Sequence, residues 1–212
     1  MRGHGSASYH VELGDDAFRQ GRYPEAEAAY REAVRLEPGN AAYHDDLGDA
    51  LCAQERYAEA EVAFREAARL EPDDAAYHAD LGDALYQQGK YSEAEAAYRE
   101  AVRLDPGNAS YPDDLGDALA GQDRYVEAEV VYREAIRLDP DDATYSCDLG
   151  EALMHQERYA EAAAAFRDAV RLEPGEASYH ASLGNALFHL DLSAAASPRP
   201  SQNIQPDSSR PM

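Results

Sequence analysis

Cysteines and long apolar runs are scarce in this chain of 212 residues, and each absence excludes a class of protein. The two cysteines, Cys52 and Cys147, lie far apart and form no CxxC pair, so we expect neither a disulfide framework nor a structural zinc site. No apolar run approaches the roughly 18 residues of a membrane span. The segment from Met1 to Tyr9 lacks the apolar stretch of a signal peptide. We therefore expect a reduced, soluble, cytoplasmic protein, and the arginine- and alanine-rich composition favours a bacterial source.

Basic residues are also few, since 19 lysines and arginines face 42 aspartates and glutamates, for a net charge of −23. Nucleic acids are disfavoured as partners, because the neutralisation of phosphates supplies most of their affinity for proteins. Anionic membrane surfaces are disfavoured for the same reason. A basic protein or peptide is favoured, because opposite charge raises both the encounter rate and the local concentration of a partner.

The most informative feature that is present is a repeat of 34 residues. A tyrosine recurs at this interval, each time followed four residues later by a Leu-Gly pair: Tyr9, Tyr43, Tyr77, Tyr111, Tyr145 and Tyr179. Such a period marks a stack of small helical units that need their neighbours to bury an apolar face. The predicted units span residues 7–40, 41–74, 75–108, 109–142 and 143–176, with a partial sixth unit at 177–190. Residues 1–6 and the Ser/Pro-rich residues 191–212 are expected to be disordered.

Each unit is predicted to contain two helices, and unit two, counted with Ala41 as position 1, serves as the example. Residues Ala41 to Gln54 carry apolar side chains on one helical face, and a second helix runs from about Ala58 to Glu71 before a proline. The glycine at position 8 lies in mid-helix and costs roughly 1 kcal/mol relative to alanine. We expect Gly48 to face the small side chains of Ala60 and Ala67 in a closely packed helical hairpin.

These residues resemble the tetratricopeptide repeat family, whose pattern has Leu-Gly at positions 7–8, a large residue at 11, alanine at 20 and 27, an aromatic at 24 and proline at 32. Unit two supplies every element: Leu47, Gly48, Leu51, Ala60, Phe64, Ala67 and Pro72. The resemblance implies an all-α fold, a right-handed α–α superhelix (solenoid) of stacked antiparallel helix pairs. It also implies that the first helix of each pair lines a concave groove for an extended peptide or a partner's helix. Two departures are a histidine at position 4 of most units and Ala17 in place of a large residue.

No catalytic constellation stands apart from the repeat, because the chain offers no Ser-His-Asp set, phosphate-binding glycine loop or isolated carboxylate pair. The histidines at position 4 form a single row, and stacked helices lie roughly 8–10 Å apart, too far for the ligands of one metal ion. We therefore predict no enzymatic activity, no cofactor and no metal. The pairs of the second helix, such as Glu27–Arg31, have the favourable i,i+4 order and are interpreted as solvated surface.

The acids of the first helix are more informative than those of the second. At positions 5 and 6 the helix dipole alone accounts for them, although Asp45 and Asp113 from this group are candidate partner-binding residues. The acids at position 9 lie two turns into the helix, beyond the reach of the dipole: Asp15, Asp49, Asp83, Asp117 and Glu151. If the first helix lines the groove, they form a stripe of carboxylates along it. Duplication of one ancestral unit would also preserve this stripe, even if the stripe had no function. Functional use and simple duplication therefore both remain possible interpretations.

Positions 12 and 13 vary most between units. Phe18, Tyr86 and Met154 stand at position 12, and His155 stands at position 13. In the family both positions face the groove, so these four residues are candidate partner contacts. The alternative is that these two positions vary by neutral drift, because their side chains contribute little to packing.

We therefore predict a non-catalytic protein–protein interaction scaffold that binds a basic peptide or helix in an acidic concave groove. The carboxylates at position 9 would attract the partner, and the apolar residues at position 12 would anchor it. One alternative is a self-associating structural array, because Leu187, Phe188 and Leu190 keep the last unit apolar where a terminal repeat should be polar. Another alternative is a helper fragment of a larger multidomain protein.

Overall fold

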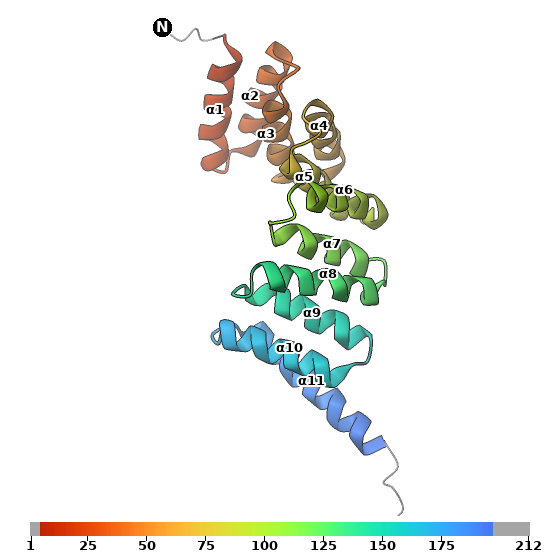
Figure 1. The fold of residues 1–212 in the computed structure, drawn as a ribbon. Coiled ribbons are helices and arrows are strands. Elements are labelled where there is room, and N and C mark those ends of the chain that lie inside the picture. The colour runs from red at the N-terminus through yellow and green to blue at the C-terminus, as the bar shows by residue number, and fades with distance from the viewer. Residues whose placement is uncertain (1–4, 197–212) are drawn as a thin grey trace, which may run out of the picture.

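The computed structural model describes residues 5–196, and the regular structure in this range is entirely helical. The helices are α1 (Ala7–Arg19), α2 (Tyr23–Leu36), α3 (Ala41–Cys52), α4 (Tyr57–Leu70), α5 (Ala75–Tyr86), α6 (Tyr91–Leu104), α7 (Ser110–Ala120), α8 (Tyr125–Leu138), α9 (Ala143–His155), α10 (Tyr159–Leu172) and α11 (Ala177–Ala196). They stack in chain order into an elongated column, with α1 at one end and α11 at the other (Figure 1). The predicted fold class, an all-α solenoid of helix pairs, is confirmed. Between residues 5 and 196 no helix combines the length and the apolar character needed to cross a membrane.

Short polar side chains start the first helix of most units. The carboxylate of Asp74 accepts a hydrogen bond from the N–H of Ala76 at 2.9 Å, and Asp142 does the same for Thr144 at 2.8 Å. These bonds satisfy backbone donors that have no partner inside the helix. Ser6 caps α1 in the same manner, although it belongs to the segment expected to be disordered.

A tight turn joins the two helices of each unit. In unit two the N–H of Arg56 donates to the carbonyl of Leu51 at 3.0 Å, and the N–H of Glu55 donates to that of Cys52 at 2.8 Å. This bond pattern ends a helix with one residue in the left-handed region, and Glu55 has a φ of 58°. The turn reverses the chain within a few residues, so the second helix packs antiparallel against the first.

An aromatic ring closes each complete helix pair against the glycine at position 8. A Cβ added to Gly48 would lie 2.4 Å from Cε1 of Phe64, the aromatic residue at position 24. The other complete pairs repeat the contact: Gly14 with Tyr30, Gly82 with Tyr98, Gly116 with Tyr132 and Gly150 with Phe166. The expectation that Gly48 faces Ala60 and Ala67 is therefore wrong, because the ring itself occupies the space that a side chain at position 8 would need.

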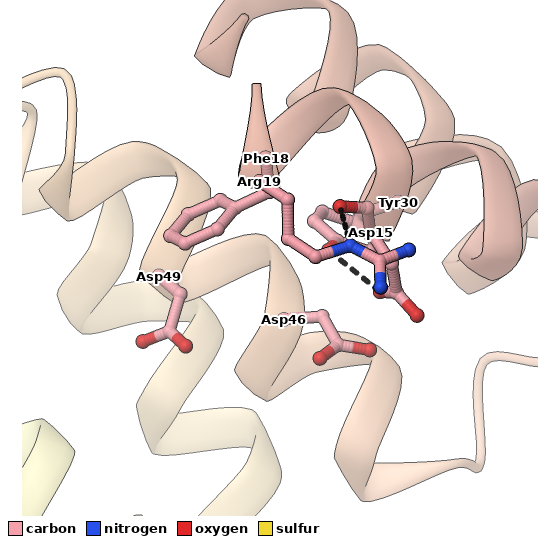
Figure 2. A pocket seen from close by; sticks show the side chains of 6 residues that line it. All are labelled: Asp15, Phe18, Arg19, Tyr30, Asp46 and Asp49. Carbon is pink, nitrogen blue, oxygen red and sulfur yellow. Dashed lines mark hydrogen bonds between the residues drawn. The ribbon is translucent and has the colours of Figure 1, made fainter. Parts of the chain in front are cut away.

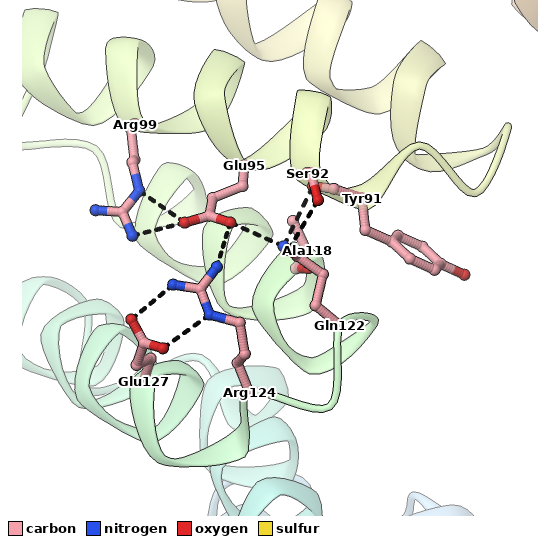
Figure 3. Close-up of polar contacts among 8 residues, drawn as sticks. All are labelled: Tyr91, Ser92, Glu95, Arg99, Ala118, Gln122, Arg124 and Glu127. Carbon is pink, nitrogen blue, oxygen red and sulfur yellow. Dashed lines mark hydrogen bonds and ion pairs between the residues drawn. The ribbon is translucent and has the colours of Figure 1, made fainter.

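Neighbouring units are joined by a glutamate at position 21 (Figure 3). Glu95 accepts hydrogen bonds from Nε2 of Gln122 at 2.8 Å and from Nη1 of Arg124 at 2.5 Å, both in the next unit. Burial raises the pKa of Glu95, but the bonds from Gln122, Arg99 and Arg124 outweigh it and leave that pKa below its ordinary value. The joint recurs along the array: Glu27 with Gln54 and Arg56, Glu61 with Gln88 and Lys90, Glu129 with Gln156 and Arg158.

The interpretation of these glutamates as solvated surface is therefore wrong. Glu27, Glu61 and Glu129 are buried at the joints, each with an i,i+4 arginine on its outer side. The arginine within the unit is visible as a local pair in the sequence, whereas the glutamine and the base of the next unit are the partners that hold the stack together.

The last helix runs past the predicted end of the array at Leu190 and continues to Ala196. Its extra turns contain leucine and alanine and no glycine or proline, so nothing local stops the helix there. The expected disorder from residue 191 is therefore wrong as far as Ala196. The remainder of the predicted disordered ends, residues 1–4 and 197–212, lies outside the described residues.

We predict opposite effects for two glycine-to-alanine changes at the same position of the repeat. Gly116→Ala lowers the free energy of unfolding by about 1–3 kcal/mol, because its Cβ would lie 2.3 Å from Cε1 of Tyr132. Gly184→Ala in α11 raises it by up to about 1 kcal/mol, because no atom lies within 4 Å of the new Cβ and alanine favours the helix. Urea unfolding at low protein concentration measures both changes. Equal effects would contradict the closure of each pair by a ring on glycine.

Candidate binding groove

The first helices of the units line a row of hollows, one at each of four junctions between neighbouring units. We call this row of hollows the groove. Each hollow is bounded by positions 9, 12 and 24 of one unit and by positions 6 and 9 of the next. The hollow between α1 and α3 has a volume of ≈ 310 Å³. Figure 2 shows Asp46 and Asp49 on α3 beside Phe18 and Arg19 on α1, with the two carboxylates extending away from the Phe18 ring.

The later hollows repeat this composition until the last one. Asp49, Asp80 and Asp83 line the second hollow, beside Cys52 and the ring of Phe64. The hollow between α7 and α9 contains these residues, among others: Tyr86, Asp117, Tyr125, Asp148, Glu151 and His155. At the junction with α11 the two acids of the following unit are replaced by Ser182 and Asn185, and Glu151 is the remaining carboxylate.

Most of the residues predicted from the sequence therefore meet in the groove. The five acids at position 9, together with Phe18, Tyr86, Met154 and His155, all line hollows. Asp45 and Asp113 line none of these four hollows, and the Oδ1 atom of each is buried without a hydrogen-bond partner among the described residues. The acids at position 6, such as Asp46 and Asp148, were assigned to the helix dipole alone, although they also line the walls.

Crowding of the carboxylates raises their pKa values. Burial, followed by the charge of Asp148, raises the pKa of Asp113 to about 9. Burial and the charge of Asp117 raise that of Asp148 to about 7. Burial, followed by the charge of Asp80, raises the pKa of Asp45, and burial, followed by the charges of Asp49 and Asp83, raises that of Asp80. Near neutral pH some of these carboxyls are therefore protonated, and not all of them carry a negative charge.

Three of the carboxylates at position 9 have a structural partner within their own unit. The hydroxyl of Tyr98 donates to Asp83 at 2.7 Å, as Tyr30 does to Asp15 and Tyr132 does to Asp117. In units two and five the ring at position 24 is Phe64 or Phe166, which carries no hydroxyl for Asp49 or Glu151. The signal for this bond was present in the sequence as an acid and a tyrosine 15 residues apart in three units.

Positive charge lies mostly elsewhere. Among residues 5–196, the carboxylates that line the four hollows form no ion pair with an arginine or lysine. Arg19 lines the first hollow, but its guanidinium pairs with Asp16 and donates to the backbone carbonyl of Asp15. The other arginines that form ion pairs are bound to acids of the second helices.

Aromatic side chains stand along one edge of the groove. The rings of Tyr125 and His155 stack with centroids 4.2 Å apart, and those of Tyr86 and Tyr91 lie 5.3 Å apart. They place flat apolar surface beside the carboxylates. In the part of the chain that the structure describes, no group of three or more His, Cys, Asp or Glu side chains is arranged to hold a metal ion. The arrangement is suited to attracting cations and contacting apolar groups.

Stacked helix pairs closed by a ring on glycine, with a groove along the first helices, define a tetratricopeptide repeat protein. The sequence matches the family described as the Cilia and flagella-associated protein 70 C-terminal domain over residues 2–199, and the chain belongs to this family of tetratricopeptide repeats. The comparison with curated protein sequences gives no match. Such repeats generally serve as protein–protein interaction scaffolds.

Solved structures share the fold at low sequence identity. MamA from Desulfovibrio magneticus RS-1 has a TM-score of 0.75 and 23% identity, over 81% of this chain and 97% of that one. YrrB, described as a TPR protein with an unusual peptide-binding site, has a TM-score of 0.69 and 19% identity, over 90% and 93%. TTC0263, a thermophilic TPR protein from Thermus thermophilus, has a TM-score of 0.66 and 18% identity, over 86% and 100%.

We predict that the protein is less stable at pH 8.5 than at about pH 5.5. A carboxyl whose pKa is raised by folding binds its proton more tightly in the folded state, so its contribution is full below about pH 4 and is lost as the pH rises through the folded value. For Asp148 and Asp113 those values are about 7 and about 9. The melting temperature in low salt should fall by several degrees between pH 5.5 and 8.5.

The joints have the opposite dependence and serve as the internal control. The lowered pKa of Glu61, about 2, gives stability that is present above pH 4.5 and is lost on acidification, so unfolding below about pH 4 is also expected. Asp113→Asn combined with Asp148→Asn should flatten the decline toward pH 8.5. A melting temperature that rises steadily from pH 5.5 to 8.5 would contradict this account of the groove.

Proposed function

We propose that this protein is a non-catalytic scaffold that binds a basic segment of another protein along its acidic groove. The observation that carries the proposal is the separation of charge between the two kinds of helix. Acids on the second helices are paired with arginines, whereas the acids that line the four hollows form no ion pair with an arginine or lysine within residues 5–196. The location in a bacterial cytoplasm remains a prediction.

A purely structural use of the stripe explains part of it. The bonds from Tyr30, Tyr98 and Tyr132 account for an acceptor at position 9 in their own units. They do not account for Asp49 and Glu151, where the facing ring is phenylalanine. They also leave the acids at position 6 without a role, since burial of these groups costs free energy unless a cation compensates them.

The spacing of the hollows favours an extended peptide. Stacked helices lie roughly 10 Å apart, and an extended chain advances about 3.3 Å per residue. About three residues of such a peptide would therefore pass each carboxylate in the stripe. Cationic side chains would meet the acids, while apolar side chains would contact Phe18, Tyr86 or Met154 along the same wall. YrrB, a tetratricopeptide repeat protein described as having an unusual peptide-binding site, supports peptide binding by this fold.

We predict that a fluorescein-labelled peptide of alternating lysine and alanine, about a dozen residues long, binds and that its glutamate–alanine counterpart does not. Asp49→Asn combined with Asp83→Asn should weaken binding about tenfold, because two attractive charges are lost while the shape and the acceptor for Tyr98 are kept. Fluorescence anisotropy at low and physiological salt measures both effects, and salt should weaken binding.

The matched control is Asp73→Asn combined with Asp141→Asn, which removes the same charge from exposed loops between units. This variant should bind nearly as well as the unaltered chain. Equal losses in the two double variants would mean that the peptide responds to net charge alone. Preference for the glutamate peptide, or indifference to Asp49 and Asp83, would refute the proposal.

We predict that binding of the same lysine peptide releases protons. A cation beside Asp46 or Asp148 favours ionisation and lowers their raised pKa values, which are about 6 and about 7 in the free protein. Affinity should therefore rise between pH 6 and pH 8. Calorimetric titration at pH 7 in buffers of different ionisation enthalpy counts the protons, and a heat that is independent of the buffer would contradict the linkage.

A further inference from the structure

The exposed face of α11 is a surface of the array that no helix within residues 5–196 covers. The side chains on this face recur at helical spacing and are all exposed: Ala177, Ala181, Gly184, Phe188, Leu192 and Ala195. Phe188 is 60% exposed and Leu192 is 51% exposed, which is unusual for large apolar residues of a helix core position. Asp191 is the single acidic residue of the helix.

In every preceding unit the second helix of the pair covers this face at position 8. The glycine at position 8 then contacts a ring, at 2.3–2.6 Å from an added Cβ. At Gly184 no atom lies within 4 Å, so the place that receives a ring elsewhere is open. Residues 191–212 contain no copy of the second-helix pattern with an aromatic at position 24. The open face is thus continuous with an interface that the protein builds five times.

The junction before α11 also departs from the repeat in a coordinated way. The glutamate of the joint is replaced by Ala163, and its partners at positions 14 and 16 are replaced by Leu190 and Leu192. The groove acids are replaced by Ser182 and Asn185, so residues 177–190 carry no acid at all. Two chains of net charge −23 repel each other over most of their surface, and this end is where the repulsion is weakest.

We propose that α11 binds α11 of a second copy of this chain, forming an antiparallel two-fold dimer in which Phe188 of each copy covers Gly184 of the other. Phe188 and Gly184 lie one turn apart on the same face, so an antiparallel pair brings each ring to the other glycine by symmetry. The dimer axis then passes close to residue 186, beside the last hollow that Asn185 lines, and the hollows of the preceding junctions remain open.

The test is sedimentation equilibrium of the full chain over about two decades of concentration around the micromolar range. We expect a monomer–dimer equilibrium that is strengthened by salt, because salt screens the repulsion between the copies. Phe188→Ala should raise the dissociation constant at least about tenfold. The matched control is Val130→Ala on α8, where the valine is 65% exposed, and it should leave the equilibrium unchanged.

Cross-linking tests the register in a chain that carries Cys52→Ser and Cys147→Ala. Asn185→Cys lies beside the two-fold axis and should form a disulfide dimer under mild oxidation. Ala177→Cys would lie about 27 Å from its counterpart and should not. Circular dichroism melting confirms that each variant is folded.

Several results would overturn the proposal. These are a strict monomer at the highest concentration, equal effects of Phe188→Ala and Val130→Ala, cross-linking at residue 177 in preference to 185, or growth into open-ended oligomers. Binding of a different protein to α11 while this chain stays monomeric would also overturn it. Dimerisation that survives loss of the groove charges leaves the basic-peptide proposal untouched, because the hollows lined by several acids lie at the earlier junctions and contain no residue of α11.

Discussion

The contact between a glycine at position 8 and an aromatic ring at position 24 is the constraint on which the rest of the structure depends. A hydrogen atom in place of a side chain lets the two helices of a unit approach until Tyr98 lies against Gly82. The equivalent ring of Tyr132 lines a hollow, and its hydroxyl donates to Asp117 on the groove side. Pair closure, groove shape and the position of one carboxylate are thus set by a single contact.

Separation of charge follows from how the units are joined. Each joint uses a base from the following unit, such as Arg124, to compensate a glutamate of the preceding second helix. With 19 bases for 42 acids, these joints and the outer ion pairs consume most of the positive charge. The acids that line the hollows receive no base within residues 5–196, so stability is gained between units while electrostatic repulsion accumulates along the groove.

Periodicity made the helices, their order and the groove-lining positions predictable, because these depend on patterns within one unit. The joints were not predictable in the same way. Glu61 appears in the sequence as half of a local pair with Arg65, whereas its other partners, Gln88 and Lys90, stand 27 and 29 residues further on. The ring that covers Gly48 was missed for a related reason, since the pattern gives both positions but not the rotation that makes them meet. The end of α11 was placed too early because no glycine or proline follows Leu190 directly. A missing helix terminator locates a helix end less well than one that is present.

The groove and α11 represent two solutions to the same electrostatic problem. In the groove the acids remain, and burial beside other acids raises the pKa values of Asp46 and Asp148, so the free protein carries less negative charge there than its composition indicates. A cationic partner would replace the protons on these carboxyls, and the free energy spent on crowding the carboxylates would be recovered on binding. At α11 the acids have been replaced by Ser182 and Asn185, and no cation is needed. A surface that keeps its charge selects a partner of opposite sign, whereas a surface without charge can accept a copy of itself.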